Sequence, residues 1–148
     1  MTKAKIYWAN ALFSDADRKF NEECVKRVRA EGHTIFLPQE AFVGDADPTN
    51  EEIFKVDTKE LQSADIVVAC LDQFPIDTGV ACEIGVAYAS SIPVIGLYTD
   101  IRKDRKGSGR MYKNQYVLGA IEINGEIVAS IDELIKTIPK YLRRLTKV

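Results

Sequence analysis

Residues 66–98 read IVVACLDQFPIDTGVACEIGVAYASSIPVIGLY, and this stretch decides the fold class. The unbroken apolar run at 66–71 is typical of a strand buried on both faces, as in the middle of a parallel sheet. A polar loop follows it, then an apolar helix at 78–90 and a second buried strand at 93–98. A strand, a helix and a strand in this order predict an α/β domain with a mostly parallel sheet.

The rest of the chain continues this alternation. Short β-forming runs predict strands at residues 5–9 and 34–37, and residues 116–123 are expected to supply the last strand before a turn at Asn124 and Gly125. Helices are expected after Ser14, over residues 50–63, and after a capping box of Ser130 and Glu133. We therefore predict one domain over residues 1–148: a doubly wound, mostly parallel five-stranded sheet flanked by helices, flavodoxin-like or Rossmann-like.

Composition narrows the class of protein. The 148 residues include 20 Lys and Arg against 22 Asp and Glu, a formal charge of −2, so general binding to nucleic-acid polymers is not expected. The three cysteines, at positions 24, 70 and 82, are not spaced as a metal motif and accompany a single histidine, so we expect reduced, mostly buried thiols and no metal. There is neither a signal-peptide pattern nor an apolar run long enough to span a membrane, so we expect a cytoplasmic protein.

Polar side chains gather in three segments that follow predicted strands: 8–14, 38–42 and 72–83. In open parallel sheets, ligands bind beyond the carboxyl ends of the strands, where the strand order changes direction. If the order is flavodoxin-like, the first and third strands are neighbours and the crevice lies between them. Tyr7 lies near the end of the first strand, and the segments contain Phe13, Gln39, Asp72 and Asp77. We therefore expect a ligand site at this edge.

Glu83 is the most informative residue of this group. It lies in GVACEIGVAYA, residues 79–89, whose other members are small or apolar. An ionised carboxylate in such surroundings is unfavourable unless something compensates its charge. One interpretation is a glutamate on a helix edge that is half-exposed or salt-bridged. Gly79, Gly85 and the nearby Asp77 favour a functional one, in which Glu83 stays ionised near the positive end of its helix and acts as a nucleophile.

Asp77 precedes this helix by one residue and is therefore a candidate N-cap. Paired with Glu83, it also suits glycosyl chemistry, in which one carboxylate attacks the anomeric carbon while a proton donor assists the leaving group. Carboxyl groups about 5–5.5 Å apart favour retention of configuration through a covalent intermediate. The spacing in the sequence does not fix that distance.

Other polar features have less specific interpretations. Asp57, in VDTKELQSAD, is by itself a candidate solvated helix residue. Residues 102–110, RKDRKGSGR, could be a phosphate-binding loop, a local nucleic-acid patch or a solvated loop. Their G-S-G is not the G-x-G-x-x-G of dinucleotide sites, and no P-loop, G-x-S-x-G or H-E-x-x-H motif is present.

Four segments together resemble the nucleoside 2-deoxyribosyltransferases. They are IYWANALFSDADRKFNE at 6–22, FLPQE at 36–40, VDTKELQSADIVVACLD at 56–72 and DTGVACEIGVAYA at 77–89. The most specific element is the pattern D-x-G-x-x-x-E-x-G at 77–85, and the resemblance extends from residue 6 to about 124. Positions that match functional positions of the family are Tyr7, Phe13, Gln39, Asp57, Asp77, Glu83 and Asn114.

The resemblance implies a ping-pong transfer of 2-deoxyribose between nucleobases. Glu83 would match the nucleophile that forms a 2-deoxyribosyl-enzyme, Tyr7 the hydroxyl that orients it, and Asp57 the group that binds the base and passes it a proton. Gln39 would match a base-recognition amide and Phe13 an apolar wall against the base. Asp77 would match the residue that holds the sugar 5′-hydroxyl.

The resemblance also implies the partners. Asn114 would match a residue that a neighbouring subunit delivers to the 5′-hydroxyl, which implies a homo-oligomer with shared sites, often a hexamer built from dimers. The ligands would be deoxynucleosides and free nucleobases, with no cofactor and no metal.

The chain departs from the family pattern at three places. Tyr116 stands two positions after Asn114, where an apolar residue is expected. Val86 replaces a frequent tyrosine, and the sequence ends in RRLTKV where some members place an aromatic residue in the site. These departures bear on base preference and on recognition of the 5′ group.

Three alternatives stay open at this point. A related hydrolase would cleave 2-deoxynucleoside 5′-monophosphates, but Val80, Ala81 and Cys82 give no serine for a phosphate, and Asp77 would repel one. A nucleotide-sensing module without catalysis is a second alternative, because fold does not imply function. A flavin carrier is a third.

Overall fold

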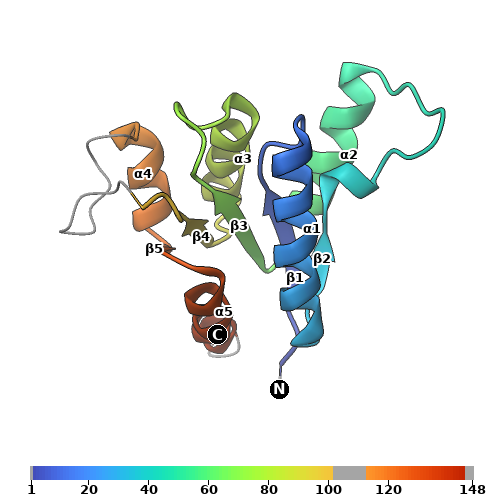
Figure 1. The fold of residues 1–148 in the computed structure, drawn as a ribbon. Helices are drawn as coiled ribbons and strands as arrows, with labels where there is room; N and C mark the ends of the chain where they lie inside the picture. Colours follow the sequence, from blue (N-terminus) through green and yellow to red (C-terminus); the bar gives the residue numbers. More distant parts are fainter. Residues whose placement is uncertain (1, 102–112, 146–148) are drawn as a thin grey trace.

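Five parallel strands form the centre of the computed structural model, which describes residues 2–101 and 113–145 (Figure 1). The strands are β1 (Lys5–Ala9), β2 (Thr34–Phe36), β3 (Ile66–Cys70), β4 (Val94–Leu97) and β5 (Glu126–Val128). The sheet order is β2-β1-β3-β4-β5, and every neighbouring pair is parallel. The predicted doubly wound five-stranded sheet is therefore confirmed, with β1 and β3 adjacent.

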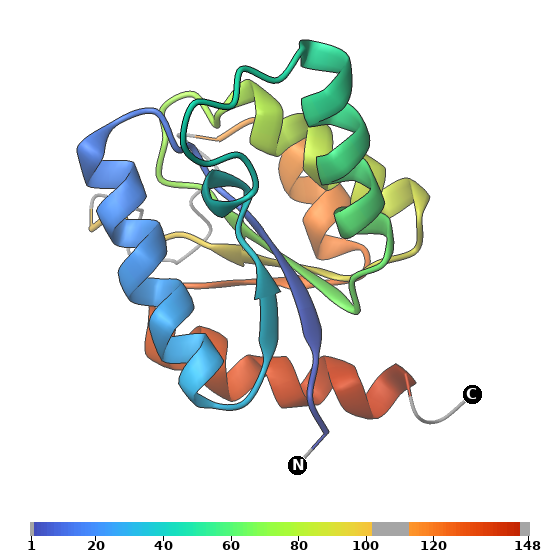
Figure 2. The same cartoon turned by 90° about the vertical axis from the view of Figure 1, so that its right-hand side faces the viewer.

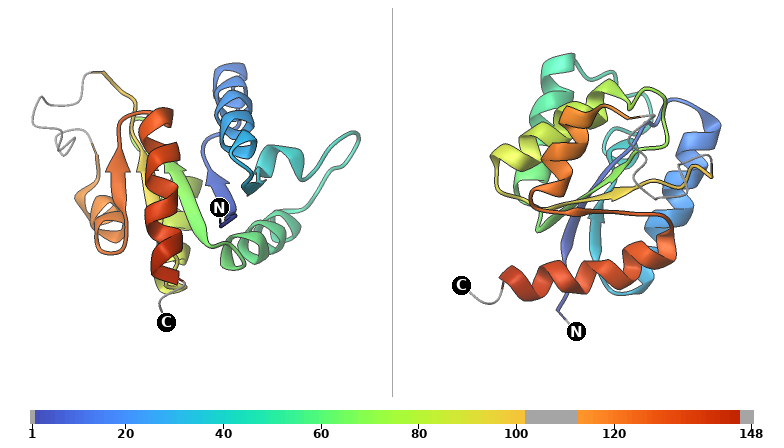
Figure 3. Two further views of the ribbon diagram at one scale, coloured as in Figure 1. Left: turned by 90° about the horizontal axis from the view of Figure 1, so that it is seen from below. Right: turned by 90° about the vertical axis from the view of Figure 1, so that its left-hand side faces the viewer.

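Helices cover both faces of the sheet. They are α1 (Asp15–Ala30), α2 (Asn50–Gln62), α3 (Thr78–Ala89), α4 (Gln115–Glu122) and α5 (Ile131–Leu145), with a 3-10 turn, η1, at Pro38–Glu40. In Figures 2 and 3, α5 lies on one side of the strands and α3 and α4 lie on the other. Successive residues of each strand alternate between the two faces, so the protein has two apolar cores.

The alternation is clearest on β1. Ile6 and Trp8 join the core beneath α1 and α5, and Tyr7 and Ala9 join the core beneath α2, α3 and α4. All four are fully buried. Tyr7 therefore faces the side of the sheet that α2 and α3 cover, and these two helices carry Asp57 and Glu83.

The prediction of a last strand at residues 116–123 is wrong. Residues Gln115–Glu122 form α4, which Asn114 caps by accepting from the N–H groups of Tyr116 and Val117, and the fifth strand is Glu126–Val128. Leu118 and Ile121 are the buried residues of α4. Their spacing suits one face of a helix, but a short apolar run does not distinguish a helix from a buried strand.

The predicted helix starts at Ser14 and Ser130 are confirmed. The Ser14 hydroxyl accepts from the N–H of Asp17, and that of Ser130 accepts from the N–H of Glu133. Cys24 and Cys70 are buried as expected, whereas Cys82 is exposed. The basic run at 102–110 lies outside the described residues, and no helix among those described is both long and apolar enough to cross a membrane.

A glycine is required where the chain enters β5. A Cβ atom added to Gly125 would lie 1.7 Å from the carbonyl oxygen of Val94. We expect Gly125→Ala to lower the free energy of unfolding by about 3 kcal/mol or more, because β4 and β5 must separate to admit a methyl group.

Chemical denaturation of this variant would measure that loss. The matched control is Gly119→Ala, whose Cβ would meet no atom within 4 Å. Because Gly119 lies within α4, alanine there should raise stability by about 0.5–1 kcal/mol. Equal stabilities of the two variants would contradict the assigned contact.

Candidate active site

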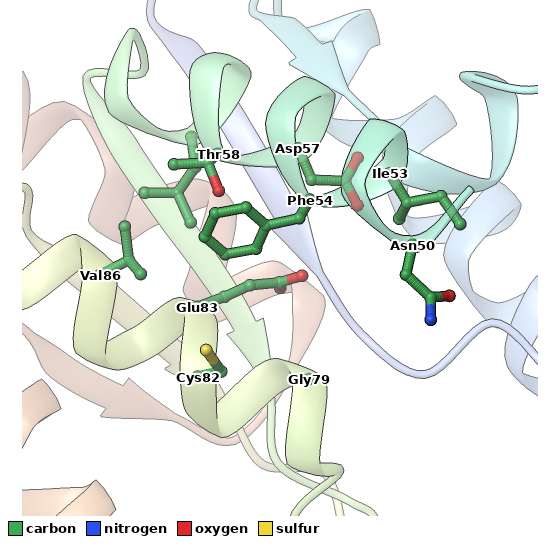
Figure 4. Close-up of a pocket in the computed structure, with 10 residues that line it drawn as sticks. Asn50, Ile53, Phe54, Asp57, Thr58, Gly79, Cys82, Glu83 and Val86 are labelled. Atoms are coloured by element: carbon green, nitrogen blue, oxygen red, sulfur yellow. The ribbon is translucent and has the colours of Figure 1, made fainter. Parts of the chain in front are cut away.

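A cleft opens at the carboxyl ends of β1 and β3, between α2, the start of α3 and the loops after β1 and β2. It has two lobes, of about 410 Å³ and about 230 Å³. The lobes share Ile53, Asp57, Gly79 and Glu83. Glu83 on α3 and Asp57 on α2 therefore stand where the two lobes meet, and Figure 4 shows both side chains extending into the opening between the helices.

Tyr7 fixes the orientation of the Glu83 carboxyl group. Its hydroxyl donates to Oε1 of Glu83 at 3.2 Å. The ring of Tyr7 is fully buried and stacks on Phe36, with 5.6 Å between centroids. Burial and the neighbouring carboxylates raise the pKa of Tyr7 far above its ordinary value, so the phenol keeps its proton and remains a donor.

Glu83 is a carboxylic acid in a largely desolvated position. Burial raises its pKa to about 8, and the charges of Asp57 and Asp77 act in the same direction, while the hydrogen bond from Tyr7 lowers it. The sequence predicts an ionised Glu83 near the helix N-terminus, whereas in this structure the protonated form dominates below about pH 8. Glu83 is six residues into α3, so burial outweighs the field of the helix end.

Asp57 faces the same opening with a partly perturbed carboxyl group. Burial raises its pKa to about 6, and its Oδ1 atom is buried without a hydrogen-bond partner. The sequence alone favoured a solvated helix residue at this position, and the structure shows a half-buried one. An unsatisfied oxygen beside a cleft is suited to a ligand that supplies the missing hydrogen bond.

Asp77 serves as the N-cap of α3, as predicted: its Oδ1 accepts from the N–H of Val80 at 3.1 Å. It also lines the larger lobe together with Glu83. The absence of a side chain at Gly79 leaves room beside this carboxyl group, because a Cβ there would lie 3.1 Å from Oδ1 of Asp77. Three carboxyl groups thus border one cleft.

The larger lobe continues to Phe13 and Gln39. Phe13 is 83% exposed at its rim, and Gln39 is buried in its wall. The Gln39 amide is already paired within the protein: its Oε1 accepts from Asn21, and its Nε2 donates to the Arg18 carbonyl and to Glu22.

Asn114 is the one predicted site residue that lies apart from the cleft of its own chain. It is exposed and caps α4, and it lines neither lobe. The structure thus brings together Tyr7, Phe13, Gln39, Asp57, Asp77 and Glu83 and leaves Asn114 outside this group.

Sequence reasoning missed several residues that line the cleft. Asn10 directly follows β1, at the predicted ligand edge, and could have been found by position. The missed residues on α1, α2 and α3 gave no comparable signal in the sequence. The residues concerned are Asn10, Arg18, Asn50, Phe54, Thr58 and Cys82. Among the described residues, no cluster of His, Cys, Asp or Glu could hold a metal ion.

Comparison with known proteins assigns the family. The family model described as nucleoside 2-deoxyribosyltransferase matches residues 6–121 of the chain. The chain belongs to this family. The match contains the three carboxylates of the cleft and Tyr7, and it confirms the resemblance seen in the sequence.

Solved structures support the assignment of the fold. A conserved protein from Enterococcus faecalis V583 is 36% identical with a TM-score of 0.84, over 94% of this chain and 99% of that one. The 2-deoxyribosyltransferase from Bacillus psychrosaccharolyticus is 23% identical, with a TM-score of 0.72 over 89% of this chain and 90% of that one. A CMP N-glycosidase from Clostridium botulinum is 16% identical, with a TM-score of 0.61 over 93% and 98%. No curated protein matches the chain.

Proposed function

We propose that this member of the family transfers 2-deoxyribose between nucleobases through a covalent 2-deoxyribosyl-glutamate. The observation that carries the proposal is the Glu83 carboxyl group, held by the Tyr7 hydroxyl at 3.2 Å and bordering one cleft with Asp57. A positioned nucleophile and a separate carboxyl group on a facing helix are the two groups that retaining glycosyl transfer requires.

In the first half-reaction, an oxygen of ionised Glu83 bonds to C1′ as the bond from C1′ to the base nitrogen breaks. The electron pair of that bond leaves with the base, and the Asp57 carboxyl group gives the base a proton. The Tyr7 hydrogen bond keeps the attacking carboxylate oriented. A 2-deoxy sugar suits this step, because no electron-withdrawing 2-hydroxyl opposes the positive charge that develops at the anomeric carbon.

In the second half-reaction, a nitrogen of another base attacks C1′, the bond from C1′ to Glu83 breaks, and Asp57 takes up the proton that the incoming base loses. Two inversions at one carbon retain its configuration. We assign Asp77 to the sugar 5′-hydroxyl. Phe13 and the wall containing Gln39 are assigned to the base.

The protonation states set a condition on this mechanism. Attack requires ionised Glu83 and protonated Asp57, whereas burial raises the pKa of Glu83 to about 8 and that of Asp57 to about 6. Near neutral pH the pair therefore holds about one proton, and the productive form has that proton on Asp57. The two groups titrate as a pair rather than singly.

Base exchange tests the proposal directly. A 2′-deoxynucleoside mixed with a different free base should yield the exchanged nucleoside, and Glu83→Ala should not form it. Release of base without exchange, with 5′-monophosphates preferred, would instead establish the hydrolase, for which Asp77 is unfavourable because it would repel a phosphate. Ligand binding without turnover, unchanged in Glu83→Ala, would establish a sensing module.

We also propose that the site is completed by a second subunit through Asn114. Its exposed position outside the cleft of its own chain supports this assignment. Mixing subunits that carry Glu83→Ala with subunits that carry Asn114→Ala should restore part of the exchange activity. Some sites of the mixed oligomer then contain an intact Glu83 from one subunit and an intact Asn114 from the other. Absence of recovery in a mixed oligomer demonstrated by mass spectrometry would contradict a shared site.

A further inference from the structure

A buried chain of amide hydrogen bonds lies directly behind the larger lobe. Its centre is Asn21 of α1, which is 1% exposed. The Oδ1 atom of Asn21 accepts from Nε1 of Trp8 at 3.0 Å and from Nδ2 of Asn10 at 2.7 Å. Its Nδ2 atom donates to the Ala11 carbonyl at 3.1 Å and to Oε1 of Gln39 at 2.9 Å. All four hydrogen-bonding positions of this amide are therefore filled.

The neighbours of Asn21 permit only one orientation of its amide. The indole of Trp8 can only donate, and the backbone carbonyl of Ala11 can only accept. The oxygen of Asn21 must therefore face Trp8, and its nitrogen must face Ala11. Turning the amide over would place two donors against each other and two acceptors against each other in a fully buried position, which is costly.

The fixed orientation of Asn21 determines which end Asn10 presents. Nδ2 of Asn10 must donate to the oxygen of Asn21, so Oδ1 of Asn10 is not used in this hydrogen bond. Among the described residues Oδ1 of Asn10 has no hydrogen-bond partner, and Asn10 lines the larger lobe. An acceptor of fixed position is thus available to a ligand at this end of the cleft.

The adjoining Gln39 cannot take this role. The same chain turns its oxygen to Asn21 and its nitrogen to the Arg18 carbonyl and Glu22. Arg18 has a different position: it lines the lobe, and its guanidinium group donates to the Leu12 carbonyl at 3.3 Å and forms no ion pair with a described residue. This end of the lobe therefore offers an acceptor from Asn10 and donors from Arg18.

We infer that Asn10 is a specificity-determining residue that accepts a hydrogen bond from the exocyclic amino group of the nucleobase. Of the groups that protrude from a base ring, an amino group donates and a carbonyl only accepts, so a carbonyl would face Oδ1 of Asn10 acceptor to acceptor. Arg18 complements the ring nitrogen next to that amino group. The favoured substrates are 6-aminopurines and 4-aminopyrimidines; this inference rests on the proposed function for the placement of the base.

The test compares adenine with unsubstituted purine, which lacks only the amino group. In exchange assays, the wild-type protein should prefer 2′-deoxyadenosine to the purine deoxynucleoside by about tenfold in kcat/KM, as expected for one neutral hydrogen bond. Asn10→Ala should bring that ratio close to one, mainly by weakening adenine. Asn124→Ala, at the exposed turn before β5, is the matched control and should keep the wild-type ratio.

Equilibrium binding of the free bases separates this inference from the proposed function, because binding needs no transfer. Suppose that the wild-type protein binds adenine more tightly than purine, that Asn10→Ala abolishes this difference, and that no exchange activity is found. This result would support the role of Asn10 and refute the transferase. Exchange activity with the same adenine-to-purine ratio in folded Asn10→Ala would overturn the role of Asn10 and leave the transferase standing. If Asn10→Ala does not fold, a wild-type preference for hypoxanthine over adenine overturns the inference by itself.

Discussion

Glu83→Gln is expected to lower the rate of base exchange by at least about 10³-fold, because the amide cannot form the bond to C1′. The variant keeps the size of the side chain and an oxygen that can accept from Tyr7. Steady-state exchange assays over a range of deoxynucleoside concentrations would measure the loss. It should appear in kcat, while binding of the free base changes little.

The same substitution should stabilise the fold at neutral and alkaline pH. The ordinary pKa of a glutamate is 4.5, whereas that of Glu83 is raised to about 8 by burial. Between these values the folded chain holds a proton that the unfolded chain has released, so ionisation weakens the fold as the pH rises from about 4.5 to about 8. Glu83→Gln removes this penalty and should gain about 4 kcal/mol at pH 8 and little at pH 4.

Urea denaturation at both pH values would measure this difference. Glu122→Gln, on the exposed end of α4, is the control and should show no such gain. Full exchange activity of Glu83→Gln would show that Glu83 is not the nucleophile. Loss of activity together with loss of stability at both pH values would indicate a purely structural role.

Asp57→Asn is expected to lower kcat/KM by about 10²–10³-fold, because the leaving base then receives no proton from this side chain. The wild-type profile of kcat/KM should be a bell with apparent pKa values of about 6 and about 8 and a maximum near pH 7. Below pH 6 both carboxyl groups are protonated and the nucleophile is lost. Above pH 8 both are ionised and the proton donor is lost.

The shape of the profile distinguishes this role from a structural one. In Asp57→Asn the alkaline limb should disappear, and the remaining acid limb should shift to higher pH, because it then follows the ionisation of Glu83 alone, whose pKa burial still raises. The control Asp45→Asn, in an exposed loop, should keep the bell. An unchanged bell in Asp57→Asn would exclude Asp57 as the proton donor.

The sequence predicts the sheet well because its central strands are unambiguous. The run at 66–71 and the helix that follows have few alternatives, and β3 and α3 lie where the pattern places them. The strand prediction for residues 116–123 was wrong because the periodicity of a short apolar run does not distinguish a helix from a strand. Leu118 and Ile121 are compatible with both. The helix is stabilised by the Asn114 N-cap and by the packing of its buried face, and this packing cannot be predicted from the local sequence.

Six of the predicted site residues lie together in the structure, but the other residues that line the cleft and the protonation state of its carboxyl groups were not predictable. Glu83 stands out because its neighbours are apolar. Tyr7 and Asp77 are expected beside it because ligands bind beyond the carboxyl ends of parallel strands. The rise in the pKa of Glu83 comes from burial together with the charges of Asp57 and Asp77, which is a property of the assembled cleft. The Asn21 chain was not predictable, because it joins three segments through side-chain contacts alone.

The most direct test of the central claim is the mass of the protein after brief reaction with a 2′-deoxynucleoside in the absence of an acceptor base. After an acid quench, the mass should rise by one 2-deoxyribosyl group per chain. Peptide mapping should place it on Glu83, and addition of a second base before the quench should remove it. An adduct on another residue, or exchange that proceeds in Glu83→Gln, would contradict the account.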